Sequence, residues 1–224
     1  HKTVALAPVK AETLNLPTDY PYGIATIAYR MPGSRAKDFA AADILGDVLS
    51  SERGAFYGLV PAGDALAAQF LYRPKPAVGF GVAFTAFPRG GDSNALLAKM
   101  RSVMAEIVKN GVPADLVEAA KRREVAQSAE RNDSISGLAQ SWSNVLAFQG
   151  LDSPDALADA YRAVTVADVD RIAREILNPD HAVTAVLTPE SSGKPVSGKG
   201  FGGAESFATP PEKPVPLPDW ANAA

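Results

Sequence analysis

The residues that most often do chemistry are scarce in this chain. It has two histidines, His1 and His181, and no cysteine. The absence of cysteine removes thiolate nucleophiles and sulfur-ligated zinc. Serine catalysis would need a histidine beside a serine, and no Gly-x-Ser-x-Gly elbow occurs. His181 follows Asp180 and is a candidate ligand or base, but a turn histidine beside an aspartate is more often a surface residue. We therefore expect no catalytic residue and no metal ligand in this chain.

Other charged or glycine-rich groups give weaker signals. Asp115, Glu118 and Glu124 share a predicted helix with the basic residues 121–123, which is typical of a solvated face with i to i+4 ion pairs. An acid pair of the glycosidase type would also need an apolar pocket, and none is indicated. The sequence GKGFGG at 198–203 fits Gly-x-Gly-x-x-Gly by letter, but no strand precedes it and no helix follows it. We interpret it as part of a linker rather than as a nucleotide-binding loop.

A turn in the first third of the chain contains the strongest candidates for binding. The stretch ILGDVLSSERGAFYGLVPAGDALAAQF, residues 44–70, ends a helical pattern, passes through a turn and resumes as an apolar strand. Arg53 and Tyr57 lie in this turn, and both side chains can donate hydrogen bonds to a substrate. The competing interpretation is an ordinary turn and helix surface. Arg53 and Tyr57 are therefore our candidate substrate-binding residues.

Apolar periodicity predicts the elements that must position this turn. Strand patterns cover residues 23–30, 65–73, 78–87 and 181–189, and helical patterns cover 37–50, 96–108, 112–131, 135–146, 153–164 and 165–176. Thr165 and Asp168 have the spacing of a capping box at the start of the last helix. Gly79 and Gly81 leave room on one face of their strand for something packed closely. Trp142 and Phe148, at helical spacing, are expected in the core.

The order of these elements indicates the fold class. One strand, one helix, two strands, several helices and a final strand predict an α+β fold. We expect a single mixed, mostly antiparallel sheet with helices packed mainly on one face. From residue 190 onward proline, glycine, serine and lysine replace the apolar pattern. The sequence therefore predicts a domain at 1–189 and an extended tail or linker at 190–224.

Composition excludes several classes of partner. The formal net charge is −3, and the basic residues do not cluster with aromatic ones, so nucleic acid is not an expected partner. No run approaches the eighteen or more apolar residues of a membrane span, so we expect no membrane partner. A chain without cysteine is indifferent to the redox state of its compartment. Between the two bacterial compartments, we favour the periplasm over the cytoplasm.

Three segments together resemble a known family. They are IAYRMPGSRAKDFAAADILGDVLSS, NGVPADLVEAAKRREV and VTVADVDRIAREILNPDHAVTAVLTP. In this order they resemble the non-catalytic domain of the M16 metallopeptidases, the family of pitrilysin, insulinase and the mitochondrial processing peptidase. The resemblance covers roughly residues 1–190. It implies an M16/LuxS-metallohydrolase-like fold, in a parent protein built from two halves of two related domains each, with zinc in the first domain.

The working motifs of that family are missing here. The family's zinc motif, His-x-x-Glu-His with a distant Glu, does not occur in this sequence. The family also has an Arg and, seven residues later, a Tyr that steady the tetrahedral intermediate. Aligned on this chain, those positions fall near Val60 and Ala67, whose side chains cannot donate a hydrogen bond. The resemblance therefore implies a non-catalytic domain, with zinc expected in the parent protein and no cofactor bound by this chain.

The resemblance leaves three functions open. The first is a domain in the wall of the peptide-binding chamber of a zinc-dependent M16 metalloendopeptidase, with an extended peptide as substrate and the remaining domains of the parent, or a partner subunit, as partners. The second is a catalytically inactive M16-like scaffold or assembly subunit. The third, an independent hydrolase that uses local acids, has the least support. An upstream His-x-x-Glu-His in the same polypeptide would separate the first two.

Overall fold

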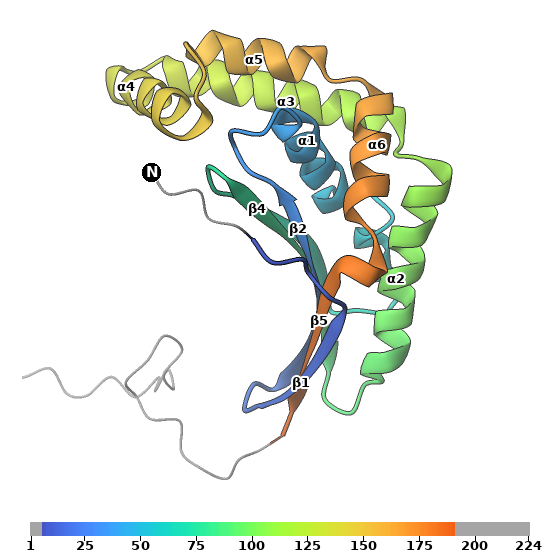
Figure 1. Cartoon of the computed structure of the whole chain (residues 1–224). Helices are drawn as coiled ribbons and strands as arrows, with labels where there is room; N and C mark the ends of the chain where they lie inside the picture. Colours follow the sequence, from blue (N-terminus) through green and yellow to red (C-terminus); the bar gives the residue numbers. More distant parts are fainter. Residues whose placement is uncertain (1–5, 191–224) are drawn as a thin grey trace, which may run out of the picture. The chain divides into compact units, whose positions relative to one another are not determined.

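A computed structural model of the protein describes residues 6–190, and these residues contain a sheet of five strands. The strands are β1 (Glu12–Thr18), β2 (Tyr22–Pro32), β3 (Ala67–Pro74), β4 (Val78–Pro88) and β5 (Ala182–Pro189). Their order across the sheet is β1-β5-β2-β4-β3 (Figure 1). The β1–β5 pair is parallel and the other pairs are antiparallel. The predicted mixed, mostly antiparallel sheet is confirmed. The predicted tail and the GKGFGG sequence lie outside the described residues.

Strand β1 was not predicted. Its sequence, ETLNLPT, is short, and six of its seven residues are exposed. It pairs with β5 at the edge of the sheet, with Leu14 opposite Ala185 and Leu16 opposite Leu187. Its conformation therefore comes from pairing with a strand that is distant in the sequence rather than from local apolar alternation.

Six α-helices follow the predicted pattern. They are α1 (Phe39–Ser50), α2 (Ser93–Asn110), α3 (Ala114–Asn132), α4 (Ile135–Asn144), α5 (Pro154–Ala163) and α6 (Val166–Ile176). Helices α1, α2 and α6 contact the sheet, while α3 and α5 pack on α1. Helices α1, α2 and α6 lie on one side of the sheet, while α4 lies off the upper end of the strands (Figure 1). Short helical turns occupy Tyr57–Leu59, Val145–Gln149 and Pro179–His181. No helix within residues 6–190 is long and apolar enough to span a membrane.

The two faces of strand β4 differ in side-chain size. Gly79, Gly81, Ala83, Thr85 and Phe87 are buried on the face that the helices cover. A Cβ atom on Gly81 would lie 2.3 Å from Sδ of Met31 and 2.6 Å from Cζ of Phe70. The room that the glycines leave is thus filled by side chains from the neighbouring strands, as the sequence predicted. Apart from Phe87, the larger apolar residues of β4 point to the other face, which no described helix covers.

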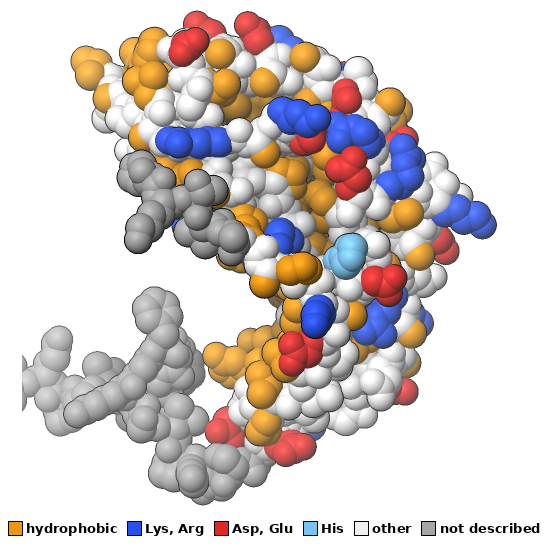
Figure 2. All heavy atoms as spheres, viewed as in Figure 1, with side chains coloured by type: hydrophobic (Ala, Val, Ile, Leu, Met, Phe, Trp, Pro, Cys, Tyr) orange, Lys and Arg blue, Asp and Glu red, His pale blue; other side chains and the backbone are white. Residues whose placement is uncertain are grey.

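The placement of the aromatic residues of α4 and of the helical turn that follows it differs from our expectation. Trp142 is 41% exposed and Phe148 52% exposed, so neither belongs to the core. Of the predicted apolar stripe on this helix only Val145 is buried, and Ile135 is 92% exposed. Hydrophobic side chains are visible on the surface over α4, at the upper left of Figure 2. Helical spacing identified the apolar face correctly, but α4 lies beyond the layer of helices that contacts the sheet, so this face stays uncovered.

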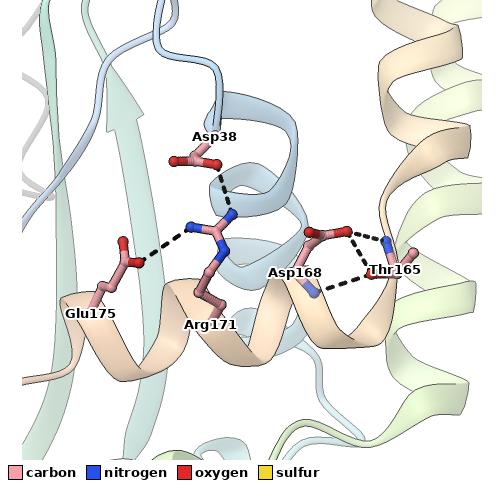
Figure 3. A network of polar contacts seen from close by, with 5 residues as sticks. All are labelled: Asp38, Thr165, Asp168, Arg171 and Glu175. Atoms are coloured by element: carbon pink, nitrogen blue, oxygen red, sulfur yellow. Dashed lines mark hydrogen bonds and ion pairs between the residues drawn. The ribbon is translucent and has the colours of Figure 1, made fainter.

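The predicted capping box is present at the start of α6. The Thr165 hydroxyl accepts a hydrogen bond from the Asp168 amide at 3.2 Å, and the Asp168 carboxylate accepts bonds from the Thr165 amide at 3.0 Å and the Thr165 hydroxyl at 2.5 Å (Figure 3). These bonds lower the pKa of the Asp168 carboxyl. One turn later Arg171 donates to Asp38 at 2.7 Å and to Glu175 at 3.3 Å. Arg171 thereby links α6 to the residue that precedes α1.

Thr165→Ala tests the contribution of this cap to stability. The substitution removes the hydroxyl that satisfies the Asp168 amide, and loss of such an N-cap costs about 1 kcal/mol. We expect the free energy of unfolding in urea to fall by this amount with the m-value unchanged. Arg174→Ala, an exposed change in the same helix, is the control and should change stability by less than about 0.5 kcal/mol. Equal effects of the two substitutions would contradict a role for the cap.

Candidate functional site

Arg53, the first candidate for substrate binding, is engaged in a surface ion pair. Its Nη2 donates to Oδ2 of Asp115, near the start of α3, at 2.5 Å. The two side chains are 68% and 61% exposed, so the pair contributes little to stability. The side chain of Arg53 thus extends from the turn to the N-terminal end of α3. Asp115 is on the solvated face of α3 that the sequence predicted.

Tyr57, the second candidate, lines a hollow at the helix-to-strand turn. The hollow has a volume of about 320 Å³, and its lining includes Tyr57, Val60, Ala67, Gln69 and Phe84. The structure therefore brings Tyr57 together with both positions at which the resemblance expects Arg and Tyr. Neither Val60 nor Ala67 carries a polar side-chain group. The phenol of Tyr57 is the one hydrogen-bonding group among these three side chains, and Arg53 does not line the hollow.

The residues do not fit a zinc ion. His181 is exposed at the end of the turn before β5, and no described residue forms a hydrogen bond or ion pair with its side chain. Within residues 6–190 no three His, Cys, Asp or Glu side chains are placed to hold a metal ion. On α1, Asp43, Gly46 and Asp47 have the spacing of the His-x-x-Glu-His motif, with carboxylates in place of the imidazoles and glycine in place of the glutamate. We therefore derive no catalytic step through zinc for these residues.

These two aspartates belong to a half-buried polar cluster that the sequence analysis missed. Tyr161 of α5 donates to Oδ2 of Asp43 at 2.5 Å. Arg123 of α3 forms an ion pair with Oδ1 of Asp47, and its Nε lies 3.8 Å from the Glu124 carboxylate. The side chains of Asp47 and Glu124 are 17% and 13% exposed. Three helices thus contribute to one cluster.

Burial changes the acidity of the cluster. It raises the pKa of Asp43 to about 6, although the bond from Tyr161 and the charge of Arg123 oppose the shift. Burial raises the pKa of Asp47 to about 7, and the neighbouring carboxyl of Glu124 adds to this effect while Arg123 opposes it. Oδ2 of Asp47 is buried and has no hydrogen-bond partner among the described residues. Asp47 and Glu124 thus form a carboxyl pair in which Asp47 stays partly protonated near neutral pH.

Glu124 corrects one expectation from the sequence. The acids of α3 were expected on a solvated face, which holds for Asp115 and for the half-exposed Glu118 but not for Glu124. The i to i+4 spacing of Asp43 and Asp47 on an otherwise apolar helix was the available signal, because acids on a helix buried on most sides need polar partners. The partners come from α3 and α5, and no local pattern identifies them.

The cluster adjoins a polar hollow beside the edge strand β3. This hollow of about 210 Å³ is lined by residues that include Asp43, Asp47, Ser50, Gln69 and Tyr72. A carboxyl group with a pKa of about 7 can give up or take a proton near neutral pH. Ser50, the hydroxyl nearest in sequence, donates instead to the backbone oxygen of Asp47 at 3.2 Å. The arrangement can thus exchange a proton, but it presents no activated serine.

Asp47→Asn tests the acidity of this pair. The raised pKa means that the folded chain retains a proton that the unfolded chain releases above about pH 4, so stability falls as the pH rises from about 4 to about 7. We expect the substitution to remove most of this fall and to raise the free energy of unfolding at pH 8 by about 2 kcal/mol, after allowance for partial exposure and screening. Urea titrations at half-unit pH steps provide the measurement.

Asp115→Asn is the matched control, because Asp115 is an exposed acid. It should leave the pH dependence of stability as it is in the unsubstituted chain. If the free energy of unfolding of the Asp47→Asn variant falls between pH 5 and 8 as steeply as that of the unsubstituted chain, Asp47 is not the group that holds the proton.

The fold has counterparts among solved structures. A protease from Helicobacter pylori matches with a TM-score of 0.73 and 18% identity over 81% of this chain and 45% of that chain. A peptidase M16 inactive domain from Pseudomonas fluorescens matches with a TM-score of 0.69 and 21% identity over 85% of this chain and 46% of that chain. An inactive peptidase domain from Bordetella parapertussis matches with a TM-score of 0.67 and 16% identity over 79% of this chain and 98% of that chain.

The sequence comparisons give no match. Neither the protein-family models nor the curated proteins include one that matches this sequence. The chain spans about half the length of the H. pylori and P. fluorescens chains and nearly the whole of the B. parapertussis domain. At these identities the likeness concerns the fold. Residues 6–190 therefore have the fold of an M16-like peptidase domain, as the resemblance predicted.

Proposed function

We propose that this chain is a non-catalytic domain of a zinc-dependent M16 metalloendopeptidase and forms part of the wall of its peptide-binding chamber. The observation that carries the proposal is the uncovered face of the sheet. On β4 this face presents Phe80, Val82 and Phe84, of which Phe80 is 47% exposed. A half-exposed apolar sheet face of this kind is typical of a surface that contacts another protein or a ligand.

Neighbouring strands continue the same surface. Val82 is paired with Leu71 of β3 on one side and Ala28 of β2 on the other. Beyond β2, the face extends to Leu187 of β5, which lies opposite Leu16 of β1. We call the uncovered face formed by Leu16, Ala28, Leu71, Phe80, Val82, Phe84 and Leu187 the open face. The open face suits an extended peptide or a neighbouring domain. Apolar contacts are not directional, so such a surface can bind peptides of different sequence.

In this proposal zinc and the catalytic residues belong to the rest of the parent protein. The chain supplies an apolar surface to which the peptide binds, and a part of the bound peptide extends to the zinc in another domain. The fold shared with about half of two longer chains, the H. pylori protease and the P. fluorescens M16 structure, supports a place within a larger polypeptide. The bacterial periplasm, where extended peptides arise during protein turnover, is the compartment we propose for it.

The alternative is a catalytically inactive scaffold or assembly subunit. Two of the similar structures are described as inactive domains, and this observation supports the alternative. The open face would then bind a partner subunit and no peptide. The test is whether the polypeptide that contains this chain hydrolyses an unfolded peptide and loses this activity when a chelator is added. Such hydrolysis supports the peptidase. Assembly with a partner subunit and no such hydrolysis supports the scaffold.

Phe80→Asp tests the open face. An acid at a half-exposed site should leave the isolated chain folded, but it would have to be desolvated against a peptide or domain. We expect peptide hydrolysis by the parent to fall about tenfold or more, because the apolar contact is lost and the new carboxylate must be desolvated, a cost that Arg30 and Arg73 opposite Phe80 offset only in part. Ile135→Asp, a matched apolar-to-acid change on α4, should have no effect on hydrolysis. Unchanged activity in Phe80→Asp would exclude the open face from the chamber.

Arg53→Ala with Tyr57→Ala tests the candidates for substrate binding. Because Arg53 is held by Asp115 outside the turn hollow, we expect the turnover of the parent to change by less than about twofold. Loss of an oxyanion-stabilising donor would instead lower kcat by about a hundredfold or more. A fall in kcat of that size with an unchanged Tm would mean that Arg53 and Tyr57 stabilise the tetrahedral intermediate after all.

A further inference from the structure

We propose that a hollow between β1, β5 and α2 binds a carboxylate group that carries a small apolar body. The hollow has a volume of about 410 Å³ and lies at the parallel edge of the sheet. Its lining includes Thr13, Tyr29 and Thr184 from the strands and Arg101 from α2. These strand residues point to the face that the helices occupy, opposite the open face. The inference is therefore independent of the proposed peptidase role.

The cation in this hollow lacks an acidic partner. Nη2 of Arg101 donates to Oγ1 of Thr184 at 3.2 Å. Thr184 is only 4% exposed, so the guanidinium is anchored on a buried hydroxyl of β5. No ion pair within residues 6–190 involves Arg101, although most of the other buried or half-buried charges described above are paired. A guanidinium has five N–H donors, and most of those of Arg101 remain available to a ligand.

Tyr29 adds a second donor at the inner end of the hollow. Its side chain is 4% exposed, and within the described part of the chain its hydroxyl has no hydrogen-bond partner. Burial raises the pKa of Tyr29 to about 12 although the positive charge of Arg101 opposes this, so the phenol keeps its proton at neutral pH. An O–H group and a guanidinium on the same hollow together suit an oxygen anion.

The remaining lining restricts the kind of anion. Arg101 is the one cation among the lining residues, and a single guanidinium does not neutralise a dianion such as phosphate. Ile27, Pro179 and Ala182 contribute apolar walls. A monoanion with a short aliphatic or branched body satisfies both conditions. A carboxylate fits, whether it belongs to a free short-chain acid or to the C-terminus of a peptide.

Calorimetric titration of the full chain with matched probes tests the proposal. Isobutyrate carries the charge and the apolar body, and isobutyramide is its neutral isostere. We expect isobutyrate to bind at least about tenfold more tightly than the amide, because a charge-assisted pair with Arg101 is lost in the amide. Inorganic phosphate should bind no better than the amide. Equal binding of the acid and the amide, or tighter binding of phosphate, would overturn the proposal.

Variants assign the binding to these residues. Arg101→Gln should weaken isobutyrate binding about tenfold, while Arg122→Gln, the same change at an exposed arginine of α3, should leave it unchanged. Tyr29→Phe should weaken binding severalfold without lowering the Tm, because the hydroxyl has no partner within the described residues. This last result separates a binding role from a packing role. Equal affinities of the Arg101→Gln and Arg122→Gln variants would exclude the site.

The two sources of carboxylate are distinguished by a further pair of probes. N-acetyl-alanyl-valine with a free C-terminus and the same peptide with an amidated C-terminus differ only in the carboxylate. Tighter binding of the free peptide than of isobutyrate, abolished in Arg101→Gln, identifies a peptide C-terminus as the ligand. Tighter binding of isobutyrate identifies a free acid. Failure of all the acids to bind would overturn this inference and leave the proposal for the open face untouched.

Discussion

The burial of α1 between the sheet and the outer helices is the constraint on which the other features depend. Ile44 and Leu45 are completely buried, and nine of the twelve residues of the helix are buried. Helix α1 contacts β3 on one side and α3, α5 and α6 on the others. A helix that is enclosed in this way must be mostly apolar, and any acid on it must find partners from neighbouring helices.

The polar cluster follows from this enclosure. Asp43 and Asp47 are buried because α3 and α5 cover the side of α1 on which they lie, and Tyr161, Arg123 and Glu124 are their partners. One guanidinium beside two carboxyls does not neutralise both, so Asp47 stays partly protonated near neutral pH. Packing of the three helices and protonation of the pair are therefore coupled.

The two faces of the sheet differ in how closely other parts of the chain pack against them. Under the helices, Gly79 and Gly81 let Tyr72, Met31 and Phe70 fill the space that larger side chains of β4 would occupy. On the open face, Phe80 and its neighbours remain partly exposed. Strand β4 thus places its larger side chains, apart from Phe87, on the side that lacks helices. This asymmetry is what favours a neighbouring domain or a peptide as the missing layer.

The sequence by itself determined the elements whose signals are local: the apolar stripes of the helices, the cap at Thr165 and the strand alternation of β2 and β4. It also indicated the α+β class and the M16-like fold. Only the tertiary structure decided the pairing of β1, the exposure of Trp142, the burial of Glu124 and the separation of Arg53 from the hollow of the turn. The physical reason is that periodicity states which face of an element is apolar, whereas burial and pairing depend on segments that are distant in the chain.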